Sequence, residues 1–120
     1  MRTRILAATI VSLSAAGLLF SADALAVDAA AAQMLAKQSG CLKCHAVDKK
    51  KDAPAYRDVA AKYKGNPGAE ERLTFHVTSG EKVKFEDGHE EEHKIVKSKD
   101  KAEIKNLVDW ILSLEGGTKY

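Results

Sequence analysis

Apolar residues recur every three or four positions in the C-terminal part of the chain, which is the spacing of one buried helix face. This stripe consists of Ile104, Leu107, Val108, Ile111 and Leu112. Two upstream segments show a weaker form of the same period, and a third is rich in alanine, the strongest helix former. The expected helices cover residues 28–38, 56–63, 69–79 and a last segment that Asp100 caps and Gly116 ends. Because no run alternates convincingly as a strand would, the sequence predicts an all-α fold of about four helices.

The longest interruption of this pattern lies between Gly80 and Lys99 and is strongly polar. Its centre carries His89 and His93, with three glutamates between them. A structureless loop of about twenty residues in a small compact domain is usually either functional or disordered. This segment is therefore the first place where we expect chemistry or disorder.

The first 26 residues have the three parts of an export signal. Arg2 and Arg4 precede an apolar run of 16 residues, and a small-x-small pattern ends at Ala26. The run is shorter than the roughly 20 residues of a membrane-spanning helix, so a retained anchor is the less favoured interpretation. We expect residues 1–26 to be a signal peptide cleaved after Ala26, and residues 27–120 to form a single periplasmic domain without a stable membrane anchor.

The domain that this cleavage would release has nearly balanced charge. The full chain has 19 basic and 17 acidic residues, and loss of Arg2, Arg4 and Asp23 leaves 17 and 16. This balance argues against a nucleic acid as the partner. A domain of 94 residues with few large aromatic side chains buries only a modest core, and such domains often gain stability from a disulfide, a metal or a cofactor.

The only two cysteines of the chain lie three positions apart and are followed directly by a histidine, in Cys41-Leu42-Lys43-Cys44-His45. C-x-x-C-H is the attachment signature of haem c. Residues three apart on a helix or tight turn point the same way, so both thiols can add to the two vinyl groups of one haem. The adjacent His45 then lies beneath the iron as its proximal ligand. The position of the motif behind an export signal supports this interpretation, because haem c is assembled on exported proteins.

Three other interpretations of Cys41 and Cys44 have to be weighed. A thioredoxin-like dithiol requires a βαβ context, which the sequence does not show. A structural disulfide is compatible with an exported protein but leaves the adjacent His45 as a coincidence. A Cys2His2 zinc set with His89 and His93 is the main alternative to haem, although the 44 residues between Cys44 and His89 far exceed the spacer of a zinc finger.

Beyond this motif, the expected domain resembles short bacterial class I c-type cytochromes over nearly its whole length. The matching pieces are an N-terminal helix leading into residues 41–45, then residues 54–63, residues 73–80 and residues 104–114. The resemblance implies a class I cytochrome c fold around one covalently bound haem c, with one haem edge exposed. It also implies that the first and last helices cross near Met34, Leu35 and Trp110. The carbonyl of Pro54 would accept a hydrogen bond from Nδ1 of His45.

The chain departs from this family at the second iron ligand. Class I cytochromes usually take it from a methionine in the loop before the last helix, but the two methionines here are Met1 and Met34. Met1 would leave with the signal, and Met34 lies on the helix before the haem motif, from which it cannot reach the opposite haem face. We expect His93 to be the distal ligand because it falls at or next to the family's position. His89 is the second choice, and His76 is a minor candidate.

Histidine in place of methionine predicts a lowered reduction potential, since a thioether favours reduced iron and an imidazole favours Fe(III). Glu90, Glu91 and Glu92 would add to this preference, and one of them could accept the free N–H of the ligand.

The leading function expected from the sequence is a periplasmic monohaem electron carrier with redox proteins as partners, a reductase or dehydrogenase on one side and an oxidase or other acceptor on the other. No nucleophile, acid–base pair or phosphate-binding loop in the sequence supports an independent enzyme. One alternative is a haem protein that binds or senses a gas by displacing the distal histidine. The other is a zinc-stabilised exported domain.

Overall fold

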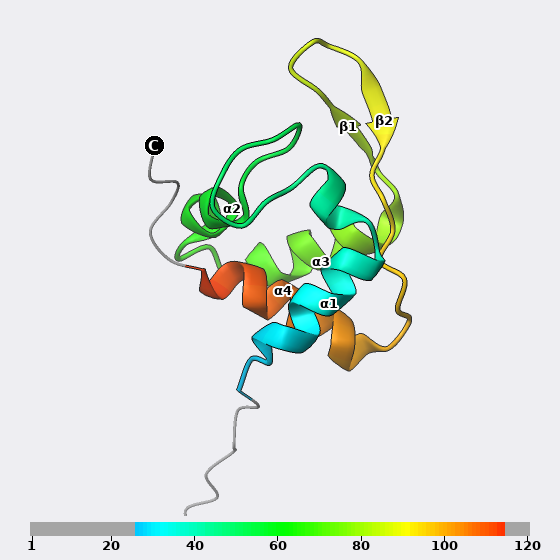
Figure 1. The fold of residues 1–120 in the computed structure, drawn as a ribbon. Helices are drawn as coiled ribbons and strands as arrows, with labels where there is room; N and C mark the ends of the chain where they lie inside the picture. The colour runs from blue at the N-terminus through cyan, green and yellow to red at the C-terminus, as the bar shows by residue number, and fades with distance from the viewer. Residues whose placement is uncertain (1–25, 115–120) are drawn as a thin grey trace, which may run out of the picture.

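A computed structural model describes residues 26–114 of the chain. Its elements are α1 (Ala29–Gln38), the 3₁₀ helix η1 (Cys41–Lys43), α2 (Tyr56–Tyr63), α3 (Ala69–Ser79), β1 (Lys82–Lys84), β2 (Glu90–Glu92) and α4 (Lys101–Ser113), shown in Figure 1. Apart from Ala26 itself, the expected signal peptide lies outside the described residues, as does the expected helix stop at Gly116. Within the described part, no helix is both long enough and apolar enough to cross a membrane.

The four helices lie where the apolar period and the capping residues place them. Asp28 caps α1 by accepting a hydrogen bond from the backbone N–H of Ala31. Asp100 caps α4 in the same way, with donors from Ala102 and Glu103. Such caps satisfy N–H groups that have no partner within the helix. The helical part of the fold prediction is therefore confirmed.

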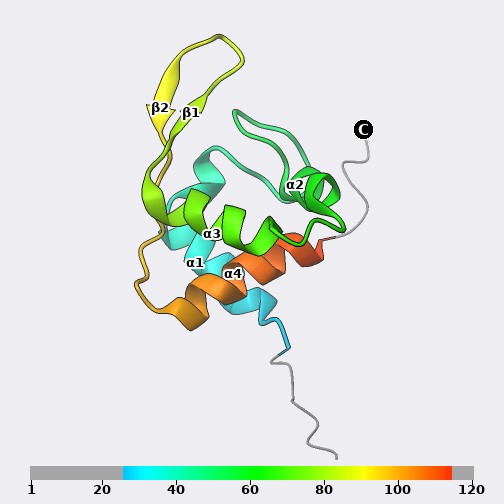
Figure 2. The same ribbon diagram turned by 180° about the vertical axis from the view of Figure 1, so that it is seen from behind.

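The core is built around α4, which contacts each of the other three α-helices. Figures 1 and 2 show α1 crossing α4 and α3 running alongside it. Leu107 and Val108 are fully buried, and Trp110 is 4% exposed. On α1 the buried residues are Ala32 and Ala36, whose small side chains allow the two helix backbones to approach closely.

The expectation that Met34 lies at this crossing is wrong, because its side chain is 60% exposed. Met34 is two positions from both Ala32 and Ala36, which is roughly 200° around a helix with 3.6 residues per turn. It therefore lies on the opposite face of α1. Leu35 and Trp110, the other two residues expected there, do pack in or against the core.

The polar segment after Gly80 contains a short antiparallel hairpin, where the sequence led us to expect a loop without strands. Its register pairs Lys82 with Glu92, Val83 with Glu91 and Lys84 with Glu90, so that two of the three cross-strand pairs join opposite charges. Gly88 adopts φ +90° at the tip, and its N–H donates to the carbonyl of Phe85, which closes the turn. Figure 1 shows that the hairpin projects away from the helices.

These packing assignments predict very different costs for two alanine substitutions. Trp110→Ala removes a buried side chain and should lower the free energy of unfolding by about 3–5 kcal/mol. Met34→Ala changes an exposed side chain and should cost less than about 0.5 kcal/mol. Denaturant unfolding of the purified proteins measures both, and equal costs for the two variants would contradict the assignment of the α1 faces.

Candidate haem site

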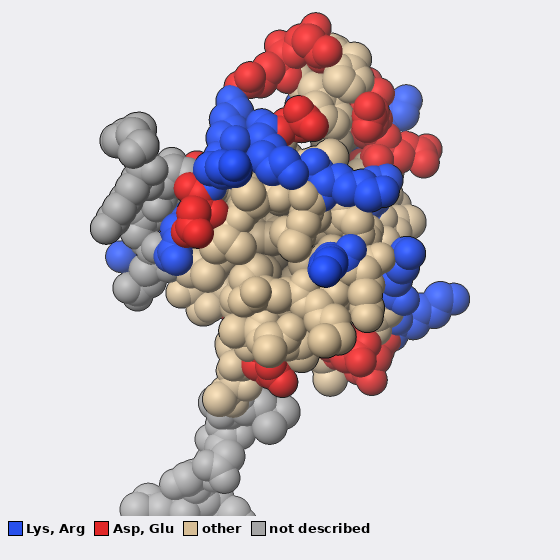
Figure 3. All heavy atoms as spheres, viewed as in Figure 1, with Lys and Arg blue, Asp and Glu red and all other residues tan. Residues whose placement is uncertain are grey.

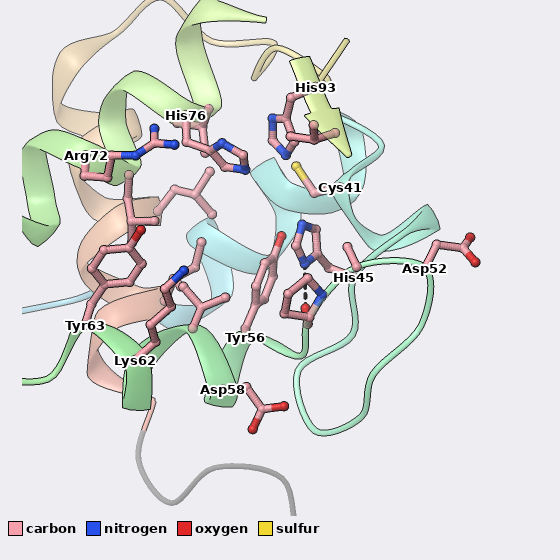
Figure 4. Close-up of a pocket in the computed structure, with 18 of the residues that line it drawn as sticks. Cys41, His45, Asp52, Tyr56, Asp58, Lys62, Tyr63, Arg72, His76 and His93 are labelled. Carbon is pink, nitrogen blue, oxygen red and sulfur yellow. Dashed lines mark hydrogen bonds between the residues drawn. The ribbon is translucent and has the colours of Figure 1, made fainter. Parts of the chain in front are cut away.

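The helices and the hairpin together enclose a cavity of about 470 Å³. Side chains from η1, α2, α3, α4 and the hairpin line it, as Figure 4 shows for most of them. One wall is apolar and consists of Leu73, Val77, Leu107 and Ile111, all of which are buried. Such a wall excludes water from whatever occupies the cavity.

The cysteine motif enters this cavity through a tight turn that follows α1. Gly40, at φ +76°, reverses the chain after the helix, and a side chain is rarely tolerated in that conformation. The N–H groups of Cys44 and His45 both donate to the carbonyl of Cys41, at 3.3 and 3.0 Å. No disulfide joins Cys41 and Cys44, and burial raises the pKa of the Cys41 thiol. The motif therefore presents two sulfur atoms and one imidazole ring from a single compact turn.

His45 is held on one side of the cavity with one ring nitrogen engaged and the other available. Its Nδ1 lies 2.7 Å from the carbonyl oxygen of Pro54, the hydrogen bond that the sequence led us to expect. Its ring stacks on Tyr56, with 4.9 Å between the ring centroids. Burial lowers the pKa of His45, so the imidazole is neutral near pH 7. With the proton on Nδ1, the lone pair of Nε2 is free to bind a metal.

His93 faces His45 from the hairpin side. Their ring centroids are 6.3 Å apart and the ring planes meet at 67°. Burial, followed by the neighbouring imidazoles of His76 and His45, lowers the pKa of His93 to about 4. His93 is therefore neutral at physiological pH. Its Nδ1 is buried and has no hydrogen-bond partner among residues 26–114. The sequence suggested that a glutamate of β2 could accept a hydrogen bond from the ligand, but none accepts one from this atom.

The structure places His89 away from the cavity. It lies at the hairpin tip, where its ring stacks on Phe85 with 4.3 Å between centroids. Its two ring nitrogens contact the carboxylates of Asp87 and Glu91. The hydrogen bond with Asp87 raises the pKa of His89, which favours a charged imidazolium rather than a neutral metal ligand. Of the two histidines in this segment, only His93 lines the cavity.

His76 also lines the cavity, although its sequence context makes it only a minor candidate ligand. Figure 4 shows it on the same side as His93, opposite His45 and Tyr56. The centroid of its ring is only 3.8 Å from that of His93. The one available signal was its position on the inward face of α3, three residues after Leu73.

The residues present fit a haem and do not fit a zinc ion. An imidazole nitrogen lies about 2.0–2.1 Å from a bound metal, so two imidazoles on opposite sides of one ion place their ring centroids roughly 6 Å apart. The separation of His45 and His93 is 6.3 Å. By contrast, no group of three or more His, Cys, Asp and Glu side chains in the described part of the chain could hold a metal ion by itself. The Cys2His2 interpretation fails because His89 lies elsewhere.

Comparison with known proteins identifies the family. Residues 29–115 match the family model for cytochrome c. Cytochrome c-551 from Allochromatium vinosum is 40% identical over 95 residues, which cover 79% of this chain and 98% of that protein. Cytochrome c-552 from Nitrosomonas europaea is 37% identical over 98 residues, which cover 80% of this chain and 92% of that protein.

Solved structures agree with this assignment. The class 1 cytochrome MtoD from Sideroxydans lithotrophicus ES-1 is 60% identical, with a TM-score of 0.72, over 76% of this chain and 100% of that one. Cytochrome c552 from Nitrosomonas europaea has a TM-score of 0.55 at 31% identity. The fold and the site define a small class I c-type cytochrome. The chain belongs to the cytochrome c family, whose small members are electron carriers, and it carries a single covalently attached haem c.

Proposed function

We propose that this chain is a periplasmic one-electron carrier whose haem iron is bound by His45 and His93. The observation that carries the proposal is the pair of neutral imidazoles that face each other across the cavity, 6.3 Å apart between centroids. The thiols of Cys41 and Cys44 would attach the haem. When bound, the haem supplies a one-electron couple between Fe(III) and Fe(II).

The residues around the cavity have distinct tasks in this proposal. The carbonyl of Pro54 accepts a hydrogen bond from Nδ1 of His45. This bond fixes the imidazole ring and makes Nε2 a better electron-pair donor to a metal. The buried apolar wall keeps water out and lowers the local dielectric. His93 supplies a neutral imidazole without first losing a proton at neutral pH. None of these tasks is acid–base or nucleophilic catalysis, so we infer a carrier and not an independent enzyme.

The cellular location and the partners that we propose for this chain rest on its expected export signal and on its surface charges. The export signal expected in residues 1–26 and the attachment of haem c to exported proteins favour the periplasm. Figure 3 shows Lys and Arg side chains gathered in a band below the hairpin, while Asp and Glu cover much of the hairpin itself. We infer that redox proteins approach a surface with separated charges, which would steer their encounter.

The first test replaces the two histidines of the hairpin segment separately. The ferric protein should be low-spin, because two imidazoles bind the iron. His93→Ala should turn it high-spin, whereas His89→Ala, the matched control, should leave the visible and EPR spectra unchanged.

A double variant removes an ambiguity from this test. The His76 ring lies beside that of His93 and could bind the iron once His93 is gone. His93→Ala/His76→Ala closes that route and must be high-spin if His93 is the ligand. A low-spin spectrum in the double variant would mean that the distal ligand lies elsewhere, and the proposed ligation would then be wrong.

The proposal also predicts a reduction potential lower than that of a His/Met cytochrome of similar fold. His93→Met should raise the midpoint potential by at least about 59 mV, the change that corresponds to a tenfold shift in a one-electron equilibrium. His89→Met should leave it unchanged, because this side chain lies outside the cavity. Redox titration with spectroscopic detection measures the three proteins. An unchanged or lowered potential in His93→Met would contradict the argument.

One observation favours a second function, the binding of a gas or small anion at the iron. His45 is anchored by a hydrogen bond, but Nδ1 of His93 has no such anchor among the described residues, so His93 would be the easier ligand to displace. Carbon monoxide added to the reduced protein separates the two functions. We expect the spectrum to stay unchanged, as for a carrier with a firmly bound His93. Rapid formation of a carbon monoxide complex would instead establish an exchangeable ligand.

A further inference from the structure

We propose that Glu81 and His76 form a positioning pair that sets the orientation of the His93 ring. The inference rests on the proposed function, in which His93 binds the iron. It concerns a role for two residues that do not themselves bind the iron. His76 lies in the last turn of α3, and Glu81 lies where the chain enters β1.

The contact between the two imidazoles is the first part of the argument. The His76 and His93 rings are 3.8 Å apart between centroids and tilted by 36°. At this separation the two rings are in van der Waals contact, so the His76 ring blocks rotation of His93 toward it. The side chain of His76 is only 25% exposed. His76 therefore forms a wall against which His93 rests.

Glu81 fixes that wall. Its carboxylate accepts a hydrogen bond from Nδ1 of His76 and pairs with Nη2 of Arg72 at 2.7 Å. These donors lower the pKa of Glu81, which keeps the carboxylate charged and the hydrogen bond to His76 charge-assisted. The side chain of Glu81 thus joins the start of the hairpin to α3.

The backbone of Glu81 acts on His93 directly. Its carbonyl oxygen accepts a hydrogen bond from the N–H of His93 at 2.9 Å. The same residue therefore holds the main chain of His93 through its carbonyl and the ring beside His93 through its carboxylate. Substitution of the Glu81 side chain removes the second link and keeps the first, which makes the two separable by experiment.

The sequence produces this arrangement through Gly80. It ends α3 in the left-handed conformation, at φ +68°, and turns the chain so that Glu81 returns to the last turn of the helix. The N–H of Glu81 then donates to Oγ of Ser79 at 3.2 Å. A Cβ at position 80 would lie 3.3 Å from Ile95, so the turn is tight as well as left-handed.

Packing matters for His93 because its Nδ1 has no hydrogen-bond partner in the described part of the chain. His45 is oriented by the bond of its Nδ1 to Pro54, whereas the ring of His93 rests on the ring of His76. The two ring planes meet at 67°. The anisotropy of a low-spin ferric EPR signal depends on the angle between two axial imidazoles, so the orientation of His93 has a spectroscopic signature.

The experiment compares His76→Ala and Glu81→Ala with His89→Ala and Asp87→Ala. The second pair of variants breaks a similar histidine–carboxylate contact, between His89 and Asp87, which lies at the hairpin tip and outside the cavity. In the fully loaded protein, His76→Ala and Glu81→Ala should remain low-spin but shift and broaden the largest g value. Carbon monoxide should leave the reduced wild type unchanged but form a detectable complex with the two reduced variants, because loss of one hydrogen bond weakens the hold on His93 roughly 2- to 10-fold. The control pair should match the wild type in both measurements.

A conservative variant separates positioning from general damage to the fold. His76→Phe keeps a ring against His93 but loses the bond to Glu81, so its g value should lie between those of the wild type and His76→Ala. Thermal unfolding of each variant checks that the fold is intact.

Three results would overturn the inference. They are an EPR signal of His76→Ala identical to that of the wild type, equal effects in the control pair, or a high-spin His76→Ala protein, which would make His76 a ligand. Failure of the proposed function has a different signature, because it appears as low-spin iron in His93→Ala/His76→Ala.

Discussion

The crossing of α1 over α4 is the contact on which the site depends. It joins residues that are 78 positions apart: the N–H of Asp28 donates to Oδ1 of Asn106, and Nδ2 of Asn106 donates to the carbonyl of Asp28. Ala32 and Ala36 let the helices approach closely along the rest of the crossing. Because the cysteine motif begins only three residues after α1 ends, fixing α1 on α4 also fixes where the thiols and His45 emerge.

Helix α4 also contacts the side of the cavity that carries His45, through a chain of aromatic rings. Trp110 of α4 meets Tyr56 edge to face, with 5.7 Å between ring centroids, and Tyr56 stacks on His45 at 4.9 Å. Packing of these aromatic rings thus connects the core to the imidazole. His45 is held by Pro54 on one edge and by this aromatic stack on its face. The position of His45 therefore depends on the packing of the core.

Local patterns in the sequence predicted the parts of this structure that depend on local spacing. The helices follow from apolar periods and capping residues. The haem attachment site follows from the spacing of Cys41, Cys44 and His45. The hairpin was missed because each strand has three residues and is held by cross-strand pairs of Lys and Glu, which a hydrophobic period does not register. Met34 was misplaced because the α1 face is selected by small residues and not by large ones. His76 and Glu81 meet through a left-handed turn, and neither residue has a motif of its own.

His45 and His93 are held in the cavity by different physical means, and the hairpin segment is part of this difference. A hydrogen bond to a backbone carbonyl orients His45 within the segment that also supplies the cysteines. His93 lies beyond a hairpin that projects from the body, and it is tied back by Glu81 and by the N–H of Val96 donating to Val77. Lys50 in the loop after the cysteine motif also pairs with Glu86 at the hairpin tip. In the proposed ligation His93 would therefore be connected to the core through its main chain and through the buried pair Val77 and Val96, whereas His45 is held by a hydrogen bond to its ring.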